Sequence, residues 1–71
     1  PIYEVRLDSL AKLTTDMISL DTLKLAKIIP EKAGRAKIIA SGKLNRKLII
    51  RGIKASKRAQ SIIEKAGGKL V

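Results

Sequence analysis

The hydrophobic positions of this chain follow a two-residue period near its start and a helical period near its end. Between residues 2 and 7, the apolar residues Tyr3, Val5 and Leu7 alternate with Glu4 and Arg6. Successive residues of a strand point to opposite faces of a sheet, so this alternation predicts a half-buried strand. The polar residues that follow it are expected to form a turn or a helix cap.

The stretch from residue 56 to residue 71 carries the clearest helix signal in the sequence. Ser56 is the predicted N-cap, because its hydroxyl can accept a hydrogen bond from the first helical turn. Gly67 comes where the helix is expected to end, since glycine readily takes the left-handed conformation found there. A short strand is predicted for residues 69–71. The apolar face of the helix, at spacings i, i+3, i+4 and i+7, consists of Ala59, Ile62, Ile63 and Ala66.

The middle of the chain predicts one short helix and two strands. A three-residue spacing of leucines predicts a helix over residues 19–28, with Ser19 or Asp21 near its start, Lys27 in its last turn and Pro30 beyond its end. Residues 36–41 and 47–53 are β-branched runs separated by residues 42–46. We interpret these two runs as a β-hairpin, with the bases of the connection at its tip.

These elements predict one small α/β domain spanning residues 1–71. It is expected to contain the β-hairpin and a C-terminal helix followed by a short strand. A chain of 71 residues can bury only a small core. The sequence starts with Pro1 rather than Met, so we expect this domain to be the C-terminal part of a longer chain.

The charge of the chain is strongly positive and unevenly distributed. Lys and Arg total 16 against 6 Asp and Glu, which gives a net charge of +10. All but three of these bases lie in residues 27–71, where only two carboxylates accompany them. This asymmetry indicates a domain that presents one side to a polyanion. Because Tyr3 is the only aromatic residue, contacts to phosphate and sugar are favoured over base stacking.

The residue types needed for most catalysis and metal binding are missing. The sequence contains no Cys and no His, and its six carboxylates are scattered. We therefore expect no catalytic residue, no metal, no cofactor and no small-molecule substrate. No apolar run is long enough to cross a bilayer. A membrane-surface module is also disfavoured, because the predicted C-terminal helix carries no Trp, Phe or Leu.

Two basic residues, Lys57 and Arg58, occupy the first turn of the predicted C-terminal helix. The helix dipole is partly positive there and favours acidic side chains by about 0.3–1 kcal/mol each. One interpretation is that exposed bases of a basic protein fall anywhere. The other interpretation, which we favour, is that these bases and the helix start together bind phosphate.

The second half of the chain resembles a known family. The resemblance lies in the run Lys37-Ile-Ile-Ala-Ser-Gly-Lys-Leu44, the pair Leu48 and Ile50, the run Ala55-Ser-Lys-Arg-Ala59, and then Ile63 and Gly67. Together these residues are similar to the C-terminal signature of the bacterial large-subunit ribosomal protein fifteen family. Its archaeal and eukaryotic relative is large-subunit protein eighteen-e. Ala40 stands where many members carry Gly.

This resemblance implies a compact α/β domain of irregular strand-strand-helix units that sits on large-subunit ribosomal RNA beside other large-subunit ribosomal proteins. It also implies a structural role in translation, in the large ribosomal subunit of the cytoplasm or of an organelle, and a basic N-terminal extension upstream of Pro1. Our alternative is a protein-interaction domain in ribosome assembly that uses the less basic residues 1–26. The candidate RNA-binding residues are Arg35, Lys37, Lys43, Arg46, Lys47, Lys54, Ser56, Lys57 and Arg58.

Overall fold

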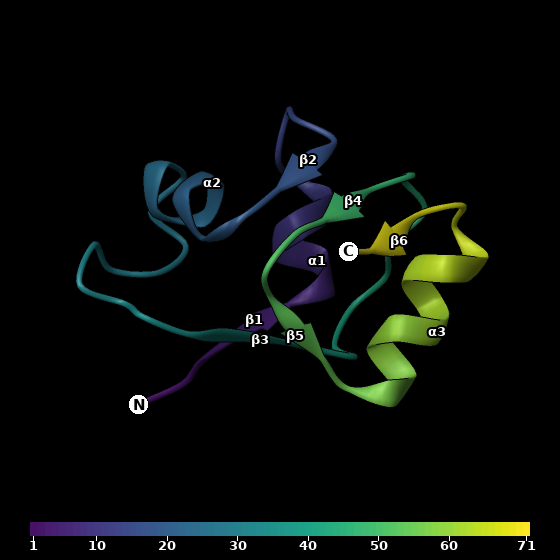
Figure 1. Cartoon of the computed structure of the whole chain (residues 1–71). Coiled ribbons are helices and arrows are strands. Elements are labelled where there is room, and N and C mark those ends of the chain that lie inside the picture. The colour runs from purple at the N-terminus through teal and green to yellow at the C-terminus, as the bar shows by residue number, and fades with distance from the viewer.

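The computed structural model describes residues 1–71 and contains three helices and two three-stranded parallel sheets (Figure 1). The prediction of a small α/β fold is confirmed. None of the three helices is long and apolar enough to cross a membrane. In chain order the elements are β1 (Tyr3–Arg6), α1 (Leu7–Ala11), β2 (Met17–Ile18), α2 (Leu20–Leu25), β3 (Ala36–Ile39), β4 (Ile49–Ile50), β5 (Lys54–Ala55), α3 (Lys57–Lys65) and β6 (Lys69–Leu70).

Consecutive strands alternate between the two sheets. We call β1-β3-β5 sheet A and β2-β4-β6 sheet B; every pairing in both sheets is parallel. In Figure 1, sheet A crosses the lower part of the molecule and sheet B lies above it. α3 stands on the right and α2 on the upper left. Two parallel strands must be joined by a long connection, because the chain has to return to the starting end of the sheet. The strands of each sheet are therefore far apart in the sequence.

The predicted β-hairpin is wrong. β3 has β1 and β5 as its two neighbours, and β4 has β2 and β6, so the two runs never pair with each other. The residues between them cross from sheet A to sheet B. Leu44 and Leu48 of this connection are buried, and their burial favours the crossing over an exposed hairpin tip.

The core is entirely apolar. The predicted first strand is confirmed as β1, where Val5 pairs in register with Ile38 and both are fully buried. No polar or charged side chain is buried. The buried residues are Val5, Leu7, Leu10, Ile18, Leu23, Ile29, Ala33, Ala36, Ile38, Leu44, Leu48, Ile50, Ile53, Ala59 and Ile63.

The two longer helices begin at the predicted serines. Ser19 accepts a hydrogen bond from the backbone N–H of Thr22 at 3.3 Å, and α2 follows it. α2 ends at Leu25, earlier than predicted, because Lys27 takes a left-handed conformation with φ 61°. The N–H of Ile28 then returns to the Leu23 carbonyl, which closes the helix end.

The predictions for α3 and the strand after it are confirmed. Ser56 accepts a hydrogen bond from the N–H of Ala59 at 3.2 Å, which caps the first turn. Gly67 has φ 91°, and the N–H of Gly68 bonds to the Ile63 carbonyl at 2.9 Å. Gly68 was not singled out from the sequence. A Cβ atom there would lie 2.3 Å from the Leu48 carbonyl oxygen, so glycine is needed for this close approach.

Candidate nucleic-acid interface

Sheet A places two of the candidate lysines side by side. Lys37 of β3 and Lys54 of β5 are register partners, and both side chains are exposed. Glu4 of β1 is the partner of Lys37 on the other side. Lys37 thus has an opposite charge on one side and a like charge on the other, and an anion bound over the two lysines would relieve the repulsion between Lys37 and Lys54.

A hollow of about 260 Å³ lies beside this row, and its charged lining is wholly basic. Arg35, Lys37 and Lys54 supply the cations. Gly34 and Gly52 also line the hollow, and nothing lies within 4 Å of the place where their Cβ atoms would be. The backbone of Arg35 is fixed, because its carbonyl accepts from the N–H of Tyr3 at 3.2 Å. This hollow, which we call the sheet-A cation site, offers three cationic side chains around an open backbone.

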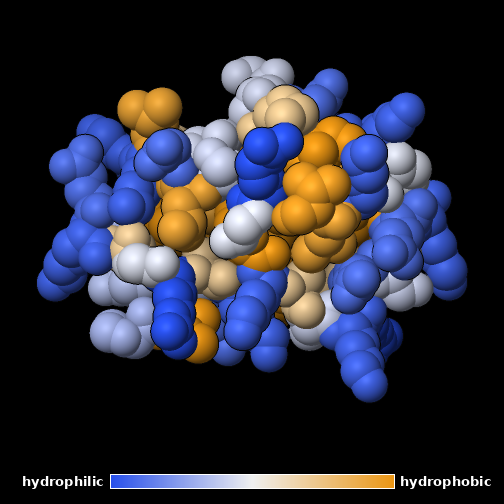
Figure 2. Space-filling view, in the orientation of Figure 1, coloured by the Kyte–Doolittle hydropathy of each residue, from blue (hydrophilic) through white to orange (hydrophobic).

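The start of α3 continues the basic surface from β5. The N–H of Ser56 donates to the Ile38 carbonyl at 3.0 Å, which fixes the helix start against β3. Lys57 and Arg58 are exposed, and neither is paired with a carboxylate. Figure 1 places β5 and the start of α3 next to each other at the lower edge of the molecule. Figure 2 shows hydrophilic side chains along that edge.

The structure places Lys47 away from the start of α3. The aliphatic stem of Lys47 lies 3.7 Å from the Cβ position of Gly67, at the C-terminal end of α3. Lys57 begins the same helix, so the two bases are at opposite ends of a helix about 14 Å long, given a rise of about 1.5 Å per residue. Lys47 therefore does not extend the basic surface at the start of α3. Lys43 is exposed next to Gly42, which packs against the side chain of Asp8.

Arg46 folds back onto the chain instead of projecting from a hairpin tip. Its guanidinium donates to the carbonyls of Ala11, Leu13 and Thr15, and to the carboxylate of Asp16 at 2.8 Å. Its side chain is only 26% exposed. We call this arrangement the Arg46 clip; it joins the crossing between the sheets to the residues that follow α1. No sequence signal indicates the clip, because the acceptors are mainly backbone carbonyls some thirty residues away.

Two of the six carboxylates are paired with arginine side chains. Asp16 is bound in the Arg46 clip, and Asp8 accepts two hydrogen bonds from Arg6, each at 3.1 Å. The hydrogen bond from Arg6 lowers the pKa of the Asp8 carboxyl from its ordinary value. No three carboxylates come together as they would around a metal ion.

A cluster of exposed cations without carboxylate partners, in a chain of net charge +10, is the electrostatic footprint expected of nucleic-acid-binding proteins. Comparison with known proteins identifies which of them this chain resembles. Residues 4–71 match the sequence model of a family of ribosomal proteins whose description includes 50S-L15 and 50S-L18e. The chain belongs to this family, as its C-terminal signature predicted.

Individual relatives agree with the family assignment. The chain is 46% identical over 67 residues to large ribosomal subunit protein uL15 of Nitrosococcus oceani. It is 49% identical to the uL15 of Hamiltonella defensa and 52% identical to that of Buchnera aphidicola. Each match covers 94% of this chain and 46% of the relative, so the chain spans about half the length of these proteins. Membership in a ribosomal protein family agrees with the prediction that the chain is not an enzyme.

Proposed function

We propose that residues 1–71 act as one RNA-binding domain in the large ribosomal subunit, without a catalytic role. The observation that carries this proposal is the sheet-A cation site, where Lys37 and Lys54 lie side by side with Arg35 at the same hollow. The family and the uL15 relatives support the choice of ribosomal RNA among polyanions. Neighbouring large-subunit proteins are proposed as further partners.

The proposed chemistry is the neutralisation of phosphates by cations that the fold holds in place. Each phosphate contact releases condensed counterions, which makes the affinity fall with salt. The register of β3 and β5 sets the spacing of Lys37 and Lys54 before RNA arrives, so binding requires little further ordering of the backbone beneath them. Lys57 and Arg58 extend the same contact along the RNA backbone from the start of α3.

The salt dependence of RNA binding tests this proposal. We expect the log–log slope of affinity for a large-subunit ribosomal RNA fragment to fall by about 1.4–1.8 when Lys37 and Lys54 are both replaced by Ala, since each phosphate contributes about 0.7–0.9. The matched control replaces Lys12 and Lys24 by Ala, which removes the same charge outside the site. Equal slopes for the two double variants would contradict the assignment of this site.

Replacing Lys57 and Arg58 together tests the second part of the surface. Both side chains are exposed, so the double Ala variant should keep its free energy of unfolding and lose RNA affinity. Unchanged RNA binding would remove the α3 start from the proposed interface while leaving the sheet-A cation site in place.

A further inference from the structure

The junction of β2 and α2 forms a second surface whose properties differ from those of the cationic one. Met17 is 52% exposed and Leu25 is 85% exposed, which makes them two of the four large hydrophobic residues that face solvent. Thr22 lies between them, and its hydroxyl donates to the Met17 carbonyl at 3.3 Å. This hydrogen bond holds the first turn of α2 against β2, so the two exposed apolar side chains have a fixed relation to each other.

Two hollows lie at this junction, and they adjoin each other because Thr22 lines both of them. The first, of about 330 Å³, is lined by Met17 and by Arg51, which follows β4. The second, of about 340 Å³, is lined by Leu13 and Leu25. We call the two hollows together the β2–α2 groove. Its lining consists of apolar side chains and hydroxyls, and Arg51 is the only charged residue in it.

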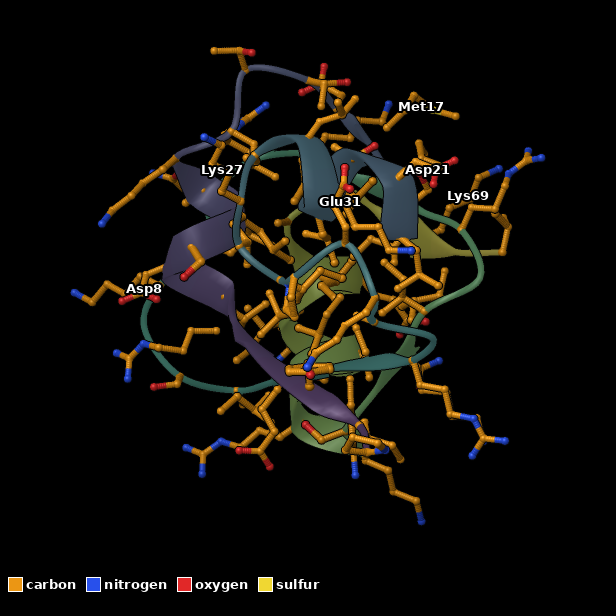
Figure 3. The ribbon with its side chains drawn as sticks, turned by 90° about the vertical axis from the view of Figure 1, so that its left-hand side faces the viewer. Asp8, Met17, Asp21, Lys27, Glu31 and Lys69 are labelled. Carbon is orange, nitrogen blue, oxygen red and sulfur yellow. The ribbon has the colours of Figure 1, made fainter.

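Charges of both signs lie at this groove, since Arg51 lines the first hollow and two exposed carboxylates lie beside it. Asp21 lies in the first turn of α2, is exposed, and has no salt-bridge partner. Figure 3 shows Asp21 and Met17 close together at the same edge of the molecule. The neighbouring carboxylate, Asp16, remains exposed although it is bound by Arg46. An RNA phosphate could pair with Arg51 but would also meet these carboxylates and the exposed aliphatic side chains, whereas a cationic side chain could pair with Asp21.

We infer that the β2–α2 groove binds a segment of another protein that carries an apolar side chain next to a Lys or Arg. The apolar side chain would be buried against Met17 and Leu25, and the cation would pair with Asp21. Burial of exposed apolar surface supplies the affinity of such a contact, and the ion pair supplies its register. The domain would then hold RNA on the side of sheet A and a basic protein segment at the β2–α2 groove. The inference rests on the proposed function in that the partner would be a neighbouring large-subunit protein, and it concerns a different surface from the RNA contact.

Site-specific cross-linking tests the inference. The full chain would carry the photoreactive residue p-benzoylphenylalanine in place of Leu25, or in place of the exposed Gln60 of α3. Each form would be irradiated with RNA-free proteins extracted from bacterial large ribosomal subunits, and again after ribosomal RNA is added back. The cross-linked peptides would be sequenced by mass spectrometry.

We expect the Leu25 position to yield a protein adduct in both mixtures, within a segment that contains an apolar residue beside a Lys or Arg. Asp21→Asn should lower the yield of that adduct about threefold, as expected for loss of a surface ion pair, whereas Glu4→Gln should leave it unchanged. An RNA adduct at the Leu25 position, no adduct in either mixture, or an equal yield with Asp21→Asn would overturn the inference. The Gln60 position reports separately on the proposed RNA contact, because it is expected to form an RNA adduct only when RNA is present.

Discussion

Replacement of Arg46 by Ala should destabilise the domain without weakening its binding to RNA. The guanidinium donates to three backbone carbonyls and one carboxylate. Hydrogen bonds to charged groups contribute about 1.5–3 kcal/mol each, and partial exposure reduces this contribution. Because the freed carbonyls can be reached by water after the side chain is removed, we expect a net loss of about 2–4 kcal/mol in the free energy of unfolding.

That loss is large for a chain of this size. At about 0.05–0.15 kcal/mol per residue, a domain of 71 residues is stable by about 4–11 kcal/mol. Urea denaturation followed by circular dichroism would measure the difference. Arg46→Lys should lose roughly half as much, since an ammonium on a flexible stem cannot reproduce the planar fork of donors.

Lys43→Ala and Lys47→Ala are the matched controls, because each removes one exposed base from the same connection. Their free energies of unfolding should stay within about 0.5 kcal/mol of the parent value. The reasoning is refuted if Arg46→Ala unfolds at the same urea concentration as the parent but binds RNA more weakly. Arg46 would then be an RNA contact of the kind that the sequence predicted.

Three further changes test the caps, the close backbone approach and the ion pair. Ser56→Ala should cost about 1 kcal/mol in the free energy of unfolding, because the first turn of α3 loses its acceptor; Ser56→Asp should retain most of it. Gly68→Ala should cost about 1–3 kcal/mol or more, because its Cβ atom would meet the backbone of Leu48. The lowered pKa of Asp8 means that the Arg6 pair stabilises the fold above the ordinary carboxyl pKa and is lost as the pH falls through the lowered value. Asp8→Asn should therefore flatten the acid side of the stability profile.

Each of these measurements has an outcome that would contradict it. An unchanged midpoint for Ser56→Ala would mean that the hydrogen bond to Ala59 contributes nothing. Gly34→Ala is the control for the glycine, since no atom lies within 4 Å of its Cβ position; equal losses at both glycines would exclude a specific contact. A parallel acid transition for Asp8→Asn and the parent would show that other carboxylates control acid unfolding.

The sequence predicted α3 well because the signals for that helix are local. A capping serine, an apolar face and a terminating glycine all act within one or two turns, and the structure confirms each of them. The strands β2 and β5 are only two residues long, which is too short for an alternating pattern to appear. The strands that pair with β3 and β4 could not be predicted from the sequence either. Alternation of apolar and polar residues predicts a strand, but it does not say which distant strand will lie beside it.

The candidate interface was likewise predictable in its composition but not in its long-range contacts. The excess of bases in residues 27–71 could be counted from the sequence, and the family signature could be read there. The adjacency of Lys37 and Lys54 arises from the parallel register of β3 and β5, which the hairpin prediction did not contain. Arg46 was grouped with the RNA-binding bases because its charge is visible in the sequence, whereas the carbonyls that bind it are not.

The alternation of strands between the two sheets has a consequence for how the chain can be made. β1 cannot pair until β3 has been synthesised, and β2 cannot pair until β4 has been synthesised. No early fragment of the chain therefore contains a complete sheet. Sheet B is finished only when β6, at Lys69–Leu70, has left the ribosome that synthesises it. Cleavage at any point between β2 and β5 leaves strands of both sheets on each fragment, so neither piece keeps a fold of its own. The domain should therefore fold in one cooperative step once β6 is available, at a rate set by its long-range pairings.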